Sequence, residues 1–337
     1  MYKIFLVGYV PDFFQRNCHT NFWPWKYITQ TLNEIGYKAF HRNADDINHS
    51  NPNIYICWNE PDTVQLIKNY KINKNSILIQ KLTSFDTSEI SQKSDWTDNP
   101  IEFFKTWTWP QYQKLNELSD SGYKFFAFGA KTETNAFPVK KKLVSKFKDY
   151  IFWIPWGSMI VPYKEIQKSK PILSDFKYDL GFVGSKWGKK NRGNIDNWDS
   201  FLMPLLEKKY STFIAGSGTE KGTINIKKHI SILKKSKLCP ILHASSWKAE
   251  KGVMDRFWTI FSLGRFGVID NEGVFDFFNK DEVVYAESKE EYLDKSMYYL
   301  ENVEKQEKYI GAILDRIKNE YNQNQVWSNI MKKVLMK

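Results

Sequence analysis

Short apolar runs alternate along this chain with segments of helical length, and this alternation restricts the fold more than any other feature. Runs such as Lys3 to Val7 and Tyr178 to Val183 are each followed by a glycine. Strands separated by helices in this way predict an α/β fold with parallel sheets. Because 337 residues exceed one typical core, we expect two such domains, with the boundary in the polar, proline-containing stretch 161–174.

The composition is that of a folded globular protein with an anionic partner. Hydrophobic residues make up 42% and charged residues 26%, which argues against a disordered chain. The net charge of +11 fits a nucleotide, a nucleic acid or an anionic membrane surface. No apolar run approaches the ~20 residues of a membrane-spanning helix. The three cysteines form no CxxC or His/Cys pattern, so we expect a reduced, cytoplasmic setting and no metal site.

The stretch from Ala249 to Asp281 contains the most informative local pattern. A turn at Gly252 precedes a helical pattern from Met254 to Leu263, and an apolar strand candidate, Phe266 to Ile269, follows. Arg256 falls in the first turn of this helix. Backbone N–H groups at a helix N-terminus, together with an arginine, can hold an anion such as a diphosphate. An ordinary helix–strand unit with a solvated arginine fits the same pattern, and these residues alone leave both interpretations open.

A basic turn opens the second half of the chain. Gly184 and Ser185 follow directly on a strand candidate, and Lys186, Lys190 and Arg192 are close behind. Small residues permit close backbone approach to a phosphate, so we interpret this turn as a phosphate contact, with a basic surface turn as the alternative.

Two further candidates stand at later strand ends. Gly216-Ser217 fits either a nucleotide contact or a plain turn, and His243 fits either a pocket residue or a structural histidine.

The first half supplies four candidates for a general base. Asp12, His19, Glu60 and Asp86 lie near strand ends, where ligands of open α/β sheets gather. Transfer to a hydroxyl needs one base within hydrogen-bond reach, so at most one of the four would serve. Asp95 and Asp98 do not make a convincing metal-binding pair.

A series of segments in the second half occurs in an order known from one family. A helix bearing an arginine precedes a glycine, an apolar strand ending in aspartate, and two later helical motifs. The segments are Trp153-Ile154-Pro155-Trp156-Gly157, Arg256-Phe257-Trp258-Thr259, Gly264, Gly267-Val268-Ile269-Asp270, Glu290-Glu291-Tyr292-Leu293 and Tyr298-Tyr299-Leu300-Glu301-Asn302. Through them, the chain from Trp153 to Met331 resembles glycosyltransferases of the GT-B fold, in particular the CgeB-like group. The order is also similar to that of phage DNA β-glucosyltransferases.

The resemblance implies two Rossmann-like domains that face each other across a cleft. The expected parts are an N-terminal acceptor domain (1–160), a nucleotide-sugar domain (175–322) and a final helix (323–337) that crosses back to the first domain. It also implies that Arg256 binds the donor diphosphate.

One departure from the family concerns Thr259, which replaces an acid that holds the ribose hydroxyls. Threonine offers single hydrogen bonds in place of a bidentate carboxylate, which leaves the identity of the nucleotide open. With this position included, the donor-binding candidates are Gly184, Ser185, Lys186, Lys190, Arg192, Gly216, Ser217, His243, Gly252, Arg256 and Thr259.

The leading hypothesis is a glycosyltransferase that moves a hexosyl or pentosyl group from a nucleotide-sugar, with UDP as the expected nucleotide. Cationic residues would replace a metal at the leaving diphosphate, so no cofactor is expected. The expected acceptor is a surface glycan or a lipid-linked glycan. A hydroxymethylated base in phage-type DNA is the alternative acceptor, and a non-catalytic nucleotide- or nucleic-acid-binding module is the alternative function. The sequence does not fix the sugar, the linkage, retention or inversion, or the oligomeric state.

Overall fold

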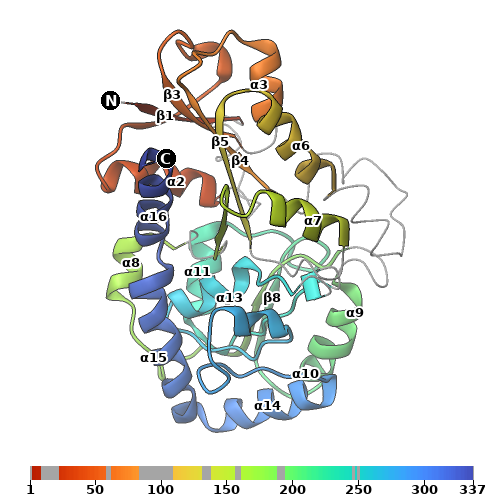
Figure 1. Ribbon diagram of the computed structural model, residues 1–337. Coiled ribbons are helices and arrows are strands. Elements are labelled where there is room, and N and C mark those ends of the chain that lie inside the picture. Colours follow the sequence, from red (N-terminus) through yellow and green to blue (C-terminus); the bar gives the residue numbers. More distant parts are fainter. Residues whose placement is uncertain are drawn as a thin grey trace.

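Two parallel β-sheets organise the computed structural model of the chain, each in its own half of the molecule (Figure 1). The structure describes residues 2–8, 23–57, 62–82, 109–130, 138–155, 161–187, 194–244, 247–248 and 251–336. All strand pairings are parallel, and helices connect the strands, so the predicted α/β class is confirmed.

The first sheet has six strands in the order β2-β1-β3-β4-β5-β6. Their bounds are β1 (Lys3–Val7), β2 (Ala39–Arg42), β3 (Asn53–Cys57), β4 (Ile77–Lys81), β5 (Lys124–Ala130) and β6 (Ile151–Ile154). Successive side chains of a strand point to opposite faces. In β1, Ile4 and Leu6 accordingly enter one apolar cluster, while Phe5 and Val7 enter the cluster on the other face. Both faces are therefore covered, as parallel sheets require.

The helices of this half connect consecutive strands. They are α2 (Trp23–Glu34), α3 (Thr63–Asn69), α6 (Trp109–Asp120) and α7 (Pro138–Lys146), with a 3₁₀ turn at Ala44–Asp46. A capping box begins α3: the Asp62 carboxylate accepts from the Gln65 N–H while the Gln65 side chain accepts from the Asp62 N–H. The sequence pattern did not predict α7, whose lysine-rich residues show little apolar periodicity.

The second sheet has the order β8-β7-β9, with β7 (Tyr178–Val183), β8 (Thr212–Ala215) and β9 (Ser236–Leu238). The apolar run through residues 237–243 predicts a longer strand than β9, but β9 ends at Leu238 because Pro240 has no N–H to donate toward β7. Beyond β9 the sheet continues through isolated bridges of Ile269 with Ile241 and with Tyr285. Residues 266–269 therefore lie in the sheet, as predicted, but form no regular strand.

The helices of the second half surround this sheet. They are α8 (Tyr163–Lys168), α9 (Ile195–Asn197), α10 (Met203–Leu206), α11 (Ile226–Lys234), α13 (Asp255–Ser262), α14 (Lys289–Glu301), α15 (Gln306–Arg316) and α16 (Gln323–Met336). Trp198–Leu202 and Ile317–Tyr321 are π-helical, and Glu272–Asp276 and Val303–Lys305 are 3₁₀ turns. In the described part of the chain, no helix combines the length and apolarity needed to cross a membrane.

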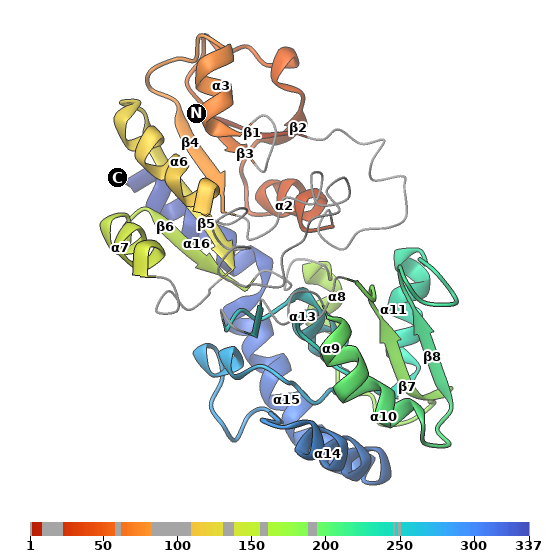
Figure 2. The same cartoon turned by 90° about the vertical axis from the view of Figure 1, so that its right-hand side faces the viewer.

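The last helix, α16, leaves the second half and packs on the first (Figures 1 and 2). Extended backbone at Asn322 separates it from the preceding helical segment. Its side chains then join the apolar cluster that contains Ile4 and Leu6, and the Trp327 ring lies 5.4 Å from that of Phe128. The final helix thus takes the position that the resemblance implies, whereas the exact domain limits stay predictions.

Candidate functional site

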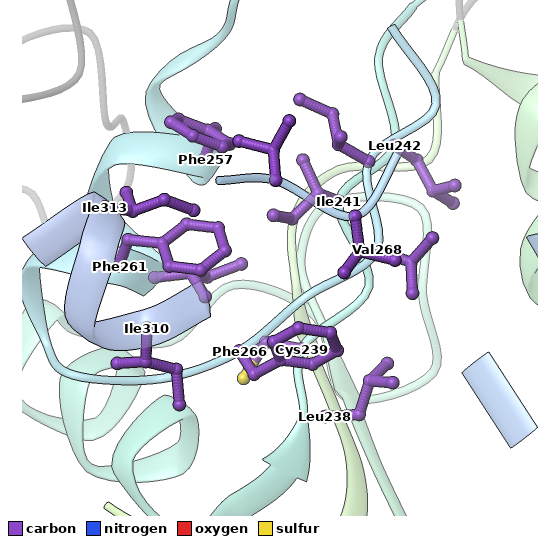
Figure 3. Packing of buried hydrophobic residues seen from close by; sticks show 14 of the residues in the cluster. Leu238, Cys239, Ile241, Leu242, Phe257, Phe261, Phe266, Val268, Ile310 and Ile313 are labelled. Carbon is purple, nitrogen blue, oxygen red and sulfur yellow. The ribbon is translucent and has the colours of Figure 1, made fainter. Parts of the chain in front are cut away.

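Helix α13 is the rigid base of the candidate site. Phe257 and Phe261 on its inner side pack against Ile310 and Ile313 of α15 (Figure 3). The helix ends at Gly264, whose φ of +71° places it in the left-handed region, where glycine is favoured. Since both the inner face and the end of α13 are fixed by packing, the residues of its first turn are held in defined positions.

Arg256, in that first turn, lies against the end of β7. A Cβ atom placed on Gly184 would come within 2.0 Å of the Arg256 Nη2 atom, so only glycine fits beside this guanidinium. Nη1 donates to the carbonyl of Leu242 at 2.8 Å, and Cζ lies 4.3 Å from the centre of the Phe182 ring. This close contact brings the predicted basic turn and the predicted anion-binding helix to one place.

The Arg256 side chain is charged, half-buried and incompletely paired. Burial lowers its pKa, yet an arginine remains protonated under all ordinary conditions. Its Nε atom is buried without a hydrogen-bond partner. No carboxylate in the described part of the chain forms an ion pair with it. A desolvated cation with an unused donor is stabilised by an incoming anion, so this geometry suits a phosphate or carboxylate ligand.

Two loops join beside this arginine. The Gly184 N–H donates to Ala215 O at 2.8 Å and the Lys186 N–H to Ser217 O at 2.7 Å. Gly216 has a φ of +143°, and a Cβ there would lie 2.0 Å from Gly184 O. Gly216 is therefore required by the close approach of the two loops.

The basic turn is also tied to the start of α9. The Asn194 side chain donates to Ser185 O at 2.6 Å and accepts from the Trp187 N–H at 2.9 Å. The Lys186 ammonium lies 3.2 Å from a carboxylate oxygen of Asp199, so this lysine already has an acidic partner. Lys190 and Arg192 lie outside the described residues, as do the four base candidates Asp12, His19, Glu60 and Asp86.

His243 is completely buried behind the first turn of α13. Its Nδ1 atom lies 2.7 Å from Asp270 Oδ1, and its Nε2 accepts from the Met254 N–H at 3.1 Å, which assigns the proton to Nδ1. Met254 is the N-cap residue of α13. Because both ring nitrogens have protein partners, the ring braces the helix start and has no group left for a donor. The structural interpretation of His243 is favoured over the pocket interpretation.

Gly252 and Thr259 also have their polar groups engaged within the protein. The Gly252 N–H donates to Trp247 O at 2.9 Å, and its carbonyl accepts from the Asn271 side chain at 2.8 Å. The Thr259 hydroxyl is buried and donates to Asp255 O, one turn earlier, at 2.8 Å. Neither residue therefore presents a free donor beside Arg256, and their contact with a nucleotide stays a prediction.

Asp270 fixes the ring of His243 behind this site. The sequence identified it only as the aspartate that ends the apolar strand and gave it no role of its own, although its place at the edge of the sheet indicated one. Among the described residues, no group of three or more His, Cys, Asp or Glu side chains is arranged to hold a metal ion.

Comparisons with known proteins agree with this architecture. Residues 173–332 match a family model described as glycosyl transferase-like. No curated protein matches the chain. Among solved structures, the chain is similar to an α-glucosyltransferase in complex with UDP-glucose and DNA containing an abasic site, at 9% identity, over 99% of both chains, with a TM-score of 0.62.

Two further solved structures extend the comparison. A DNA-modifying β-glucosyltransferase is 12% identical over 98% of this chain and 99% of its own, with a TM-score of 0.56. TarM of S. aureus, in complex with fondaparinux, α-GlcNAc-glycerol and UDP, is 12% identical over 84% of this chain and 55% of its own, with a TM-score of 0.51. The chain has the GT-B fold of these glycosyltransferases, and the family match to its second half supports an enzyme of the glycosyltransferase class. The CgeB-like assignment stays a prediction.

Proposed function

We propose that the protein is a glycosyltransferase that uses a UDP-sugar, with the diphosphate of the donor held by Arg256 beside Gly184. One observation carries the proposal: a buried, incompletely paired guanidinium lies directly against a glycine at the end of β7. The glycine lets the guanidinium lie against the end of β7, and the helix N-terminus adds its partial positive charge. The family match of residues 173–332 and the UDP complexes of the structural neighbours support the choice of donor.

Negative charge builds on the diphosphate as the sugar–phosphate bond breaks. Arg256 offsets that charge without moving, because Leu242 O, the Phe182 ring and the packed helix already hold its guanidinium in place. A preorganised cation in a desolvated site stabilises the transition state more than the same cation in water does. In this proposal the protein's own cations take the role of a metal, and no cofactor is required.

The acceptor hydroxyl would be bound by the first domain, with one of Asp12, His19, Glu60 and Asp86 as general base. We propose that the acceptor is a glycan or a lipid-linked glycan, which is the commoner type of acceptor in the CgeB-like group that the second half resembles. We also propose that the protein is cytoplasmic. Attachment to an anionic membrane surface is compatible with the charge of +11.

The distribution of lysines favours a second candidate acceptor, modified DNA. Residues 207–238, which include β8, α11 and β9, contain eight lysines and two glutamates, so this segment supplies a net +6 of the chain's +11. Phosphate contacts by such a surface give binding that weakens steeply with salt. The α-glucosyltransferase neighbour was solved with DNA.

The test is nucleotide binding by wild type and Arg256→Ala, followed by UDP release from a panel of UDP-sugars. We expect UDP affinity to fall about 100-fold in the variant, since a charge-assisted contact to a phosphate is lost. Arg265→Ala is the matched control, because that buried arginine donates to the carbonyls of Ile172, Ser236 and Lys237 and should change stability without changing UDP affinity.

Equal UDP affinity in wild type and Arg256→Ala would contradict the proposed donor site. UDP release with a glycan acceptor but not with hydroxymethylated DNA would select the first acceptor class, and the reverse result would select the second. Nucleotide binding without any donor hydrolysis or transfer would favour the non-catalytic module.

A further inference from the structure

One buried peptide group lies behind the first turn of α13 and connects Arg256 to Asp270. It is the peptide group that joins Leu242 to His243, two residues with almost no exposed surface. Its carbonyl oxygen accepts from Arg256 Nη1 at 2.8 Å, and its N–H donates to Asp270 Oδ1 at 3.0 Å. Because the two polar groups of a peptide bond share one plane, the Asp270 carboxylate fixes the direction of the carbonyl that holds the guanidinium.

The ring of His243 forms a second connection between Asp270 and the same turn. Asp270 Oδ1 lies 2.7 Å from Nδ1, which leaves Nε2 as the acceptor for the Met254 N–H at 3.1 Å. Met254 is the N-cap residue of α13, and its own side chain forms no capping hydrogen bond. The imidazole therefore satisfies the start of the helix from a distant position in the chain, where the local sequence supplies no cap.

The next two backbone N–H groups of α13 are unused within the protein. In the described part of the chain, the N–H groups of Asp255 and Arg256 have no acceptor. They belong to the same turn as the Arg256 side chain, whose Nε atom is also unpaired. These donors can meet one anion together only while the turn stays helical, and the first turn of a helix frays readily.

The two connections give Asp270 and His243 a role that involves no contact with a nucleotide. We propose that they are positioning residues for donor binding, which hold the first turn of α13 and the Arg256 guanidinium in the orientation that receives the diphosphate. Both ring nitrogens of His243 are paired within the protein, and both side chains are fully buried, so they act only through Met254 and Arg256. This inference rests on the proposed function.

Two substitutions of His243 separate positioning from a purely structural role. His243→Asn keeps a donor for Asp270, because the amide nitrogen takes the place of Nδ1, but it removes the acceptor of the Met254 N–H. His243→Gln does the reverse, since its longer side chain brings an amide oxygen to the place of Nε2. Each variant loses one buried hydrogen bond, so both should unfold at a lower temperature than wild type, by similar amounts.

UDP affinity should distinguish these two variants. In His243→Asn the first turn of α13 can fray, and binding must order it again, so UDP affinity should fall about fivefold, the effect of one lost helix cap. The donor KM should rise by the same factor with little change in kcat. His243→Gln keeps the acceptor and should recover most of the affinity lost in His243→Asn. Equal UDP affinities of the two variants would contradict the inference.

Hydrogen exchange of the wild-type protein tests the same coupling without a substitution. If His243 and the nucleotide stabilise the same turn, UDP should slow exchange of the Met254 N–H, because coupling between two interactions is reciprocal. An unchanged exchange rate with UDP bound would overturn the inference, even if neither variant folds.

Failure of the proposed function gives a different result. If UDP affinity is the same in wild type and Arg256→Ala, the donor site itself is wrong, and the inference fails with it. UDP affinity that depends on Arg256 but is equal in His243→Asn and His243→Gln removes the inference alone.

Discussion

Two polar side chains at the first turn of α13, those of His243 and Arg256, differ in how completely they are hydrogen-bonded. On one side, His243 is fully buried and both of its ring nitrogens are paired, with Asp270 and with the Met254 N–H. On the other side, Arg256 keeps a buried Nε atom that has no hydrogen-bond partner among the described residues. Burial alone therefore does not separate structural from functional polar residues. An unpaired donor does not do so either, since the Nε atom of the structural Arg265 is also buried and unpaired. Arg256 differs from Arg265 in its place beside Gly184 at the end of β7.

The difference has a physical basis in how the helix is held. The paired side fixes the start of α13, because the ring of His243 satisfies an N–H that helix geometry leaves without an internal partner. The unpaired side carries a free-energy penalty in the absence of ligand, which a ligand can remove. The paired His243 therefore contributes to the stability of the fold, whereas the unpaired donor of Arg256 is available to stabilise a bound ligand.

The largest expected effect on stability comes from Asp270→Ala, which removes the hydrogen-bond acceptor of His243. This change leaves the ring N–H and the backbone N–H of His243 without an acceptor in a fully buried position. We expect the free energy of unfolding to fall by about 3–5 kcal/mol, measured by urea denaturation. As a control, Asp199→Ala removes only a partly exposed ion pair with Lys186 and should cost less than about 1 kcal/mol. A similar small loss for both variants would contradict the contrast between the two sides.

A second effect should appear in the pH dependence of stability, through His229. Burial lowers its pKa to about 4 in the folded protein, against about 6.5 when unfolded, so between these values the unfolded chain binds the extra proton. Stability should therefore fall as the pH drops from 6.5 to 4, by about 3 kcal/mol from this group. The measurement is the difference in unfolding free energy between wild type and His229→Leu at pH 7, 5.5 and 4. Parallel pH profiles of the two proteins would show that the ring does not titrate in this way.

A smaller effect is expected from Gly184→Ala, which displaces the Arg256 guanidinium by steric overlap without removing any of its polar groups. The new methyl group would overlap Arg256 Nη2, so the guanidinium must shift, and the donor KM should rise about tenfold. The comparison is Gly311→Ala in α15, where an added Cβ meets nothing within 4 Å and the helix should gain about 0.5–1 kcal/mol. Steady-state kinetics and thermal unfolding of both variants give the two quantities. An unchanged KM in Gly184→Ala would mean that the position of Arg256 does not matter for the donor.

The sequence predicted those features that short-range patterns determine. Helix α13 was expected at Met254 to Leu263 and extends from Asp255 to Ser262, because its apolar spacing and Gly264 define both ends. Prediction of the strand after residue 237 was less successful, since Pro240 ends its pairing with β7. The parallel arrangement of both sheets followed from the alternation of strands and helices.

The state of individual polar side chains could not be predicted in the same way. Whether Thr259 donates to its own helix or faces a ligand depends on the rotamer of its side chain. Whether Arg256 lies beside Gly184 depends on how the first turn of α13 is placed at the end of β7. Such contacts join residues far apart in sequence, so no local pattern encodes them.

The crossing of α16 has a consequence for how the chain is made. Val326, Trp327, Ile330, Met331 and Val334 complete the apolar cluster on one face of the first sheet. During synthesis these residues leave the ribosome only after the whole second domain. Until α16 has been synthesised, that face of the first sheet is uncovered, and Ile4, Ile54 and their neighbours remain exposed to water.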